Sequence, residues 1–474
     1  MEQKTELADE QYNKMVNTPV WKLITKLAIP TITSMLVTSL YNMADTFFVS
    51  QLGTDASAAV GIVFPIMSII QACGFTLGMG SGSLVSIRLG QKRNEEASVI
   101  SSTAFFAALG IGILITIFGN VFASGVLSFI GAGDTVLPYA KDYARYIFWG
   151  APFMCASFVL NNDLRAEGKA FFSMIALTIG GILNMILDPF FIFTELPLFG
   201  ADSSIVLKGF GLGISGAAIC TLLTQFTSFW LLFSFYLRRK SICHISVKNV
   251  AKTPDVLGKV VTTGLPSLAR QGLASVASIM LNKTAAGFGV SAVAAMAIVG
   301  KIVMFIASMM IGIGQGFSPV SGYNYGAKRY DRVRKAYVFL VISGACFMSV
   351  FAVIAVIFAP QIIRAFRDDP EVIEVGAVAL RWQAAFLPLH SLIVGTNMLM
   401  QSTRHIKQAT FLSMNRQGVY FIPAILLLPM MCGLLGVEIS QAVADLLSTL
   451  TAIPYMIWFF RKLPNRERPD ALPA

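Results

Sequence analysis

Three polar side chains stand inside long apolar stretches of this chain, and their types are those that bind a proton or a cation. Asp45 lies in PTITSMLVTSLYNMADTFFVSQLG, and Asn184 and Asp188 lie in NMILDP. An ionised side chain at the centre of a bilayer costs from about 2.5 to more than 10 kcal/mol, so an acid there is a functional-site hypothesis by default. Asn184 and Asp188 are four residues apart, so a helix places them on one face.

These side chains predict a site that couples ion binding to a change of charge. Two carboxylates that lie close together at low dielectric cannot both stay ionised, so Asp45 and Asp188 would share a proton or bind a cation. A sodium ion would take both carboxylates and the Asn184 carbonyl as ligands, and no other metal is expected. The alternatives are structural: Asp45 as a hydrogen-bonded acid, Asp188 as a helix-end residue before Pro189, and Asn184 as a bond between helices.

The elements that must position these residues are membrane-spanning helices. The chain has 474 residues, of which 55% are hydrophobic and 13% charged, and its mean hydropathy is +0.70. Soluble proteins are about 25% charged, and one crossing needs about 20 apolar residues, so we expect an all-α polytopic membrane protein with about 12 transmembrane helices. The apolar stretches predict helices over residues 22–49, 57–83, 97–121, 138–160, 169–194 and 211–237, and then over 257–283, 291–320, 335–360, 375–400, 408–430 and 436–460.

The chain has a net charge of +11, and its basic residues are concentrated in alternate loops. The positive-inside rule then places both termini of this multi-pass protein in the cytoplasm, and no nucleic-acid partner is expected. The predicted parts are a tail over 1–21, a first lobe over 22–237, a cytoplasmic linker over 238–256, a second lobe over 257–460 and a tail over 461–474. The six cysteines show no CxxC spacing and are expected to be core side chains, so no cofactor or catalytic site is predicted.

The two lobes are copies of one another. Pro30 matches Pro266, Gly53 matches Gly289 and Gly90 matches Gly326, all at an offset of 236 residues. Two six-helix copies with the same orientation imply a pseudo-twofold axis along the membrane normal and a cavity between the lobes. Pro30 and Pro266 are expected to kink their helices, and Gly90 and Gly326 to cap theirs. The second copy has Leu281 in place of Asp45, so the ion chemistry is expected in the first lobe alone.

Other polar residues in the apolar stretches are candidates for the wall of this cavity, because polar side chains in such helices point inward. They are Tyr41, Asn42, Gln71, Arg270, Gln271 and Lys301. The bases of the second lobe are Arg270, Lys301 and Arg416, and they would bind anionic or zwitterionic substrates or balance the charge of a carboxylate. The alternative for each base is a stabilising pair with a carbonyl or a nearby acid.

With the repeat, the first-helix motif and NMILDP, the chain resembles the multidrug and toxic compound extrusion (MATE) family, and within it the DinF-like and MepA-like bacterial branch. The resemblance covers essentially the whole chain. It implies an antiporter, not an enzyme, of the bacterial cytoplasmic (inner) membrane, which exports lipophilic, mostly cationic drugs or toxic metabolites against a proton or sodium gradient by alternating access. We expect the protein to be a monomer. It places Asp45 on the family's first-helix acid, Pro30 on its kink proline, and Asn184 and Asp188 on the fifth-helix pair.

One rival interpretation remains from the residues themselves. A lipid or lipid-linked saccharide flippase of related architecture would need a basic cavity for phosphates, which Arg270, Lys301 and Arg416 would supply. A membrane transferase would need an acidic or metal motif beside a groove, and a channel would need rings of repeated pore groups. Neither pattern occurs in the sequence.

Overall fold

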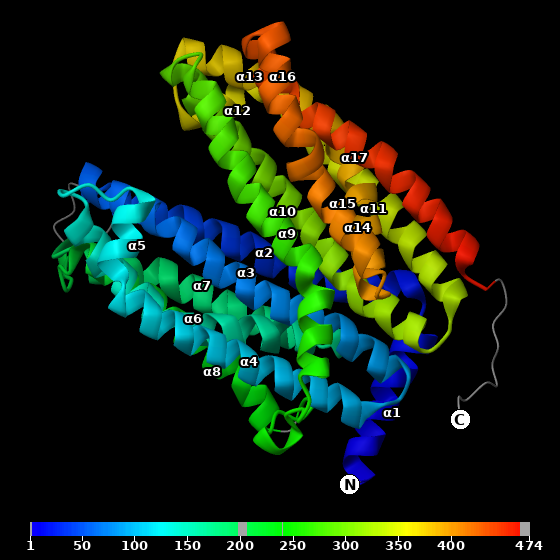
Figure 1. Cartoon of the computed structure of the whole chain (residues 1–474). Helices are drawn as coiled ribbons and strands as arrows, with labels where there is room; N and C mark the ends of the chain where they lie inside the picture. The colour runs from blue at the N-terminus through cyan, green and yellow to red at the C-terminus, as the bar shows by residue number, and fades with distance from the viewer. Residues whose placement is uncertain (1, 198–205, 239, 465–474) are drawn as a thin grey trace.

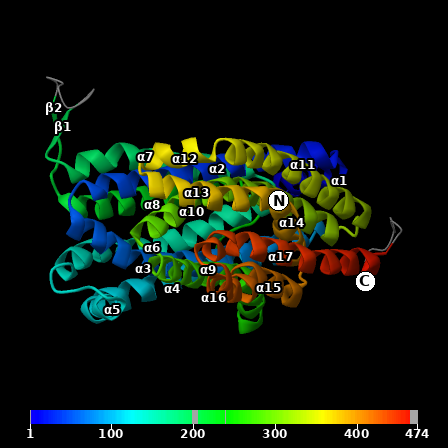
Figure 2. The ribbon, with the colours of Figure 1, turned by 90° about the horizontal axis from the view of Figure 1, so that it is seen from above.

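The first half of the chain forms one helical lobe in the computed structural model, which describes residues 2–197, 206–238 and 240–464. The elements of this half are α1 (Glu2–Asn17), α2 (Val20–Ser50), α3 (Thr54–Gly90), α4 (Asn94–Val121), α5 (Ala123–Ile130), α6 (Leu137–Ala166), α7 (Ala170–Ile192), β1 (Glu195–Pro197), β2 (Val206–Lys208) and α8 (Gly213–Leu237). The antiparallel ribbon β1–β2 joins α7 to α8 and projects beyond the helices at the end of the molecule away from the C-terminus (Figure 2).

The second half repeats this pattern after the turn η1 (Val247–Asn249). Its elements are α9 (Pro254–Ala286), α10 (Val290–Gly326), α11 (Tyr330–Ile357), α12 (Ala359–Phe366), α13 (Pro370–Phe386), η2 (Leu387–Leu389), α14 (His390–Ser402), α15 (Ile406–Met414), the π-helical turn η3 (Asn415–Tyr420), α16 (Phe421–Cys432) and α17 (Leu434–Lys462). Of the predicted C-terminal tail, residues 465–474 lie outside the described residues, as does residue 239 of the linker.

Each of the twelve predicted helices has a counterpart, and the helical fold is confirmed. Ten helical segments of the described chain are long and apolar enough to cross a membrane. The two long helices outside that set are α6 and α9, whose sequences carry more charged and polar residues. Pro30 and Pro266 lie inside continuous helices.

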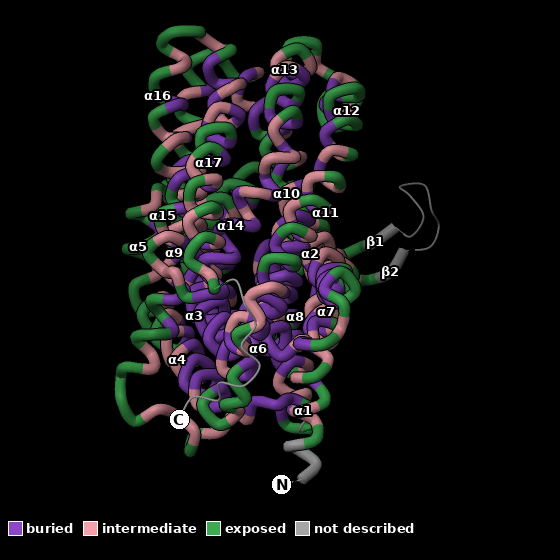
Figure 3. The backbone as a smooth tube through the Cα atoms, turned by 90° about the vertical axis from the view of Figure 1, so that its right-hand side faces the viewer, coloured by how far each residue is buried: buried purple, intermediate pink, exposed green. Residues whose placement is uncertain are grey.

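The two halves meet at the end of the molecule near the termini, called here the terminal end, and diverge at the other, the open end (Figure 1). The buried backbone gathers around α3, α6 and α1, whereas the tips of α12, α13 and α16 are largely exposed (Figure 3). The N-terminal helix α1, which the sequence did not suggest, packs at the terminal end: its Met15 is fully buried, its Asp9 pairs with Lys92 at 3.0 Å, and Asn324 of the second lobe donates to the Met15 carbonyl.

Glycines allow the two lobes to come into backbone contact at the terminal end. A side chain at Gly264 of α9 would collide with the Thr76 carbonyl of α3, and one at Gly80 of α3 would collide with the Val260 carbonyl of α9. Thr31 of α2 donates across the same interface to the Gly312 carbonyl of α10 at 2.6 Å. The interface is therefore closely packed.

The prediction that Gly90 and Gly326 cap their helices is wrong. Each is the last residue of its helix, and the residues with left-handed backbone are Lys92 and Lys328, two positions later. The glycines are instead interface residues, because a side chain at Gly90 would meet the Tyr323 carbonyl and one at Gly326 would meet the Ile87 carbonyl. A glycine stands at each of these positions because the lobes approach closely there, not because a turn requires it.

A buried carboxylate holds the start of the linker against the first lobe. Glu167, which is fully buried, accepts hydrogen bonds from the Ser241 hydroxyl at 2.5 Å and from the backbone amides of Ile242 and Cys243 at 2.9 Å each. The start of the linker is therefore fixed in place between the halves.

Candidate functional site

Asp45, Asn184 and Asp188 come together inside the first lobe. Asp45 lies five residues before the end of α2 and Asp188 lies four residues before the end of α7, so both are in the half of the lobe toward the open end. Asn184 donates to an Asp188 carboxylate oxygen over 3.4 Å, as expected for positions one helical turn apart. The carboxylates of Asp45 and Asp188 are close enough to interact electrostatically. The sequence-predicted neighbours are thus placed in one site.

This site has more acceptor oxygens than donors. Asp45 Oδ1, Asn184 Oδ1 and Asp188 Oδ2 are each buried, and none has a hydrogen-bond partner among the described residues. Buried polar atoms are nearly always paired, and an unpaired one requires an explanation such as an ion. Two carboxylate oxygens and an amide oxygen are hard ligands that suit a proton shared between acids or a sodium ion.

Two residues of the site carried no signal in the sequence. Tyr143 of α6 is fully buried, its hydroxyl has no partner among the described residues, and it interacts electrostatically with both acids. Cys220 of α8 lies next to Asn184, with its sulfur 3.6 Å from the amide nitrogen and 3.7 Å from the backbone carbonyl. Neither belongs to a motif, and only the packing of α6 and α8 around α7 could have placed them.

The cavity candidates of the first lobe have different surroundings. Tyr41, one turn before Asp45 on α2, is half-buried and interacts electrostatically with that acid. Asn42 is exposed and donates to the Thr38 carbonyl of its own helix at 2.7 Å. Gln71 of α3 is half-buried. Only Tyr41 is therefore placed beside the acid cluster by a described interaction.

In the second lobe, Arg270 and Gln271 of α9 are half-buried and Lys301 of α10 is exposed. Neither base forms an ion pair with an acid in the described part of the chain. Their role as cavity residues stays a prediction.

Arg416 has a partner that its sequence surroundings did not indicate. Asp445 of α17 is 2% exposed and accepts from Arg416 Nε at 2.6 Å, from Gln441 at 2.9 Å and shares a hydrogen bond of 3.1 Å with His390. Arg416 belongs to the π-helical turn η3, a local widening that is frequent at functional sites. The structure thus shows Arg416 in a stabilising pair with a nearby acid, which was the alternative to a role in the cavity.

No group of three or more His, Cys, Asp or Glu side chains in the described part of the chain could hold a metal ion. The site in the first lobe has two acids and an amide, which is fewer ionisable ligands than such a centre would need.

A family model matches both halves of this chain, and known proteins are similar to it over nearly its whole length. The MatE family model matches twice, over residues 30–190 and 266–426, so the two starts and the two ends are both 236 residues apart, which is the offset of the repeat. The multidrug export protein MepA of Staphylococcus aureus strain N315 is 24% identical over 452 residues, which cover 94% of this chain and 96% of that protein. MepA of Staphylococcus saprophyticus is also 24% identical, over 448 residues.

Solved structures agree with this similarity. A multidrug resistance MATE family transporter of the MOP superfamily, solved in an outward-facing conformation, superposes with a TM-score of 0.87 at 26% identity, covering 95% of this chain and 98% of that one. A MATE protein in a bent conformation superposes with a TM-score of 0.86 at 26% identity and the same coverage.

Proposed function

This chain belongs to the MatE family, and on that premise we propose that it exports multiple lipophilic, mostly cationic compounds in exchange for a proton or a sodium ion. The similarity to the multidrug export protein MepA over nearly the full length of both chains supports the transport class. The cluster of Asp45, Asn184 and Asp188 supports the coupling role, because its buried oxygens lack partners among the described residues.

The proposed exchange uses the charge of that cluster. With both acids ionised, the first lobe attracts a cationic compound. Binding of a proton or sodium ion at Asp45 and Asp188 removes negative charge, weakens that attraction and favours release. An ion can drive transport only if it binds the inward-open and outward-open conformations with different affinity. Coupling therefore requires that the geometry of the acid cluster change as the lobes rock.

We place the protein as a monomer in a bacterial cytoplasmic membrane with both termini in the cytoplasm. In that orientation the two lobes meet on the cytoplasmic side and diverge on the outer side (Figure 1). This is the state in which an exporter releases its cargo and takes up the coupling ion.

The experiment is an accumulation assay in efflux-deficient cells. Cells that express the protein should retain less of a fluorescent lipophilic cation than control cells, and collapse of the driving gradient should abolish the difference. Collapsing the proton and sodium gradients separately, with a protonophore and a sodium ionophore, identifies the ion.

Asp45→Asn should remove export, whereas Asp55→Asn, a matched change at an exposed acid at the start of α3, should leave it intact. Equal retention in expressing and control cells would contradict drug export. An active Asp45→Asn variant would contradict the coupling role while leaving the transport class in place.

The flippase alternative depends on free bases in the second lobe. Arg416 is held by Asp445 and is not free to bind a phosphate. This leaves Arg270 and Lys301, one half-buried and one exposed, as the remaining basis for that alternative.

A further inference from the structure

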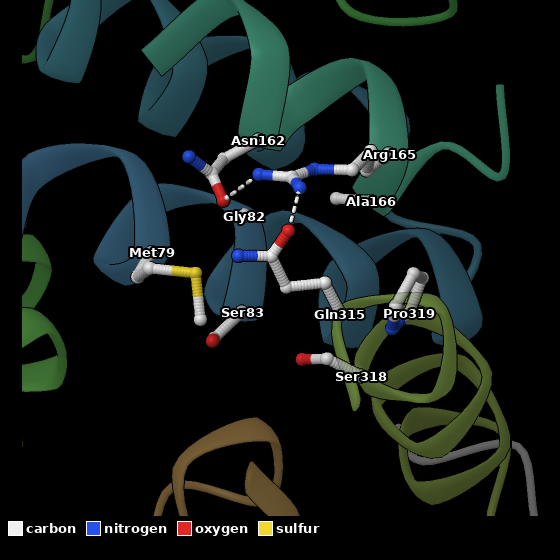
Figure 4. A pocket seen from close by; sticks show the side chains of 9 residues that line it. All are labelled: Met79, Gly82, Ser83, Asn162, Arg165, Ala166, Gln315, Ser318 and Pro319. Atoms are coloured by element: carbon white, nitrogen blue, oxygen red, sulfur yellow. Dashed lines mark hydrogen bonds between the residues drawn. The ribbon is translucent and has the colours of Figure 1, made fainter. Parts of the chain in front are cut away.

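A small pocket lies where the two lobes meet, between α3, α6 and α10 (Figure 4). Its polar lining comes from both halves of the chain, with Ser83, Asn162 and Arg165 from the first lobe and Gln315 and Ser318 from the second. The free space is about that of one or two water-sized particles.

The pocket contains a buried cation whose partners are neutral. Arg165 is 4% exposed, and its guanidinium donates to Asn162 Oδ1 at 2.8 Å and to Gln315 Oε1 across the lobe interface. No carboxylate in the described ranges pairs with it: the adjacent Asp163 accepts instead from Ser81 at 2.7 Å and Ser101 at 2.5 Å. An unpaired buried charge is costly, so a compensating negative charge would be strongly favoured here.

The remaining polar groups around the pocket are mainly donors. A guanidinium has five N–H groups, and the structure describes only two acceptors for that of Arg165. The hydroxyl of Ser83, a residue that is 3% exposed, has no hydrogen-bond partner among the described residues. The side-chain oxygen of Gln315 accepts the hydrogen bond from Arg165. The amide nitrogen of Gln315 points toward the side where Ser83 and Met79 lie (Figure 4). A buried positive charge with unused N–H groups, beside the further donors of Gln315 and Ser83, favours an anion in this pocket.

We propose that this pocket binds a small monovalent anion of the size of chloride between the two lobes. Arg165 and Gln315 belong to different lobes, so the site is complete only while the terminal end is closed. The anion therefore stabilises the conformation described here and acts as a modulator of the conformational cycle. This role goes beyond the proposed export and does not depend on which compounds are carried.

The test is thermal unfolding of the purified full-length protein in detergent, with gluconate replaced stepwise by chloride at constant ionic strength. A saturable rise of the wild-type Tm is expected, and at chloride ten times its Kd the folded state should gain roughly elevenfold in population over the unfolded one. Arg165→Gln should abolish the chloride-dependent shift and Ser83→Ala should weaken it. Arg364→Gln, at an exposed arginine of α12, is the matched control and should retain the wild-type shift.

Two outcomes would overturn the proposal. One is a Tm that does not differ between gluconate and chloride in the wild type. The other is a chloride shift that persists undiminished in Ser83→Ala and Arg165→Gln, which would assign the effect to other sites. If Arg165→Gln does not fold, bromide-soaked crystals of the wild type give the decision: an anomalous peak beside Arg165 supports the site, and its absence there at saturating bromide contradicts it.

Discussion

At the scale of single residues, Asp445 connects the polar centre of the second lobe, which consists of Asp445, Arg416, Gln441 and His390. It is a nearly fully buried carboxylate that accepts from Arg416, Gln441 and His390, and so neutralises the arginine inside the bundle. Replacing only one member of a buried pair is more harmful than replacing both, because the other charge is left without compensation.

Asp445→Asn should therefore lower the free energy of unfolding by about 3 kcal/mol, measured by thermal or denaturant unfolding in detergent. The double variant Asp445→Asn with Arg416→Met should recover part of that loss, since it removes the stranded charge. Losses that simply add in the double variant would show that the two side chains do not stabilise each other.

Residue types alone located the first-lobe acids but could not locate this centre. Asp45 and Asp188 stand out because a carboxylate in an apolar helix is costly wherever it points. Asp445 lies in a helix that begins LLGVEISQAVADLLS, where other polar residues surround it in the sequence, and two of its three partners, Arg416 and His390, are 29 and 55 residues away. Tyr143 and Cys220 likewise become site residues only through packing of separate helices.

At the scale of elements, the interface between α3 and α9 depends on the absence of side chains at particular positions. Gly264 faces the Thr76 carbonyl, whereas a side chain at Gly272 of the same helix would meet open space, with no neighbouring atom within 4 Å. Whether a glycine of α9 is needed for close packing therefore depends on its position along the helix, not on the composition of the helix.

Gly264→Val should consequently force α9 away from α3, with an expected cost of about 1–3 kcal/mol for overpacking. Gly272→Val changes helix propensity in the same way but meets no neighbour, so it serves as the control. Equal unfolding temperatures for the two variants would contradict a closely packed interface at the terminal end.

Helix bounds followed from hydropathy to within about seven residues, because about 20 apolar residues are required for each crossing. Helix α1 was missed for the opposite reason. Its sequence EQKTELADEQYNKMVN is polar, and its stabilising contacts, such as those of Asp9 with Lys92 and Met15 with Asn324, join residues far apart in the chain. The roles of Gly90 and Gly326 were misjudged because their partners lie in the other lobe.

At the scale of the whole molecule, helix α1 and the end of α17 lie toward the end where the lobes meet (Figure 1). The basic loops predict that this end faces the cytoplasm. The orientation decides whether the conformation described here releases cargo outward or inward.

A fluorescent protein that matures only in the cytoplasm, fused after residue 474, should therefore be fluorescent in cells, and alkaline phosphatase fused at the same place should be inactive. A phosphatase fusion in the loop between α5 and α6, at the open end, should be active and serves as the reciprocal control. The reverse pattern would invert the membrane orientation and with it the direction of the proposed transport.

The close glycine contacts at the terminal end have a mechanical consequence. Helix α3 has 37 residues, which at 1.5 Å per residue is about 56 Å of helix. A tilt of about 10° around contacts near its base would carry the opposite tip through about 10 Å, while atoms near the pivot slide only slightly. In the proposed exchange, a small change of angle at the closely packed terminal end would therefore produce a wide movement of the helix tips at the open end.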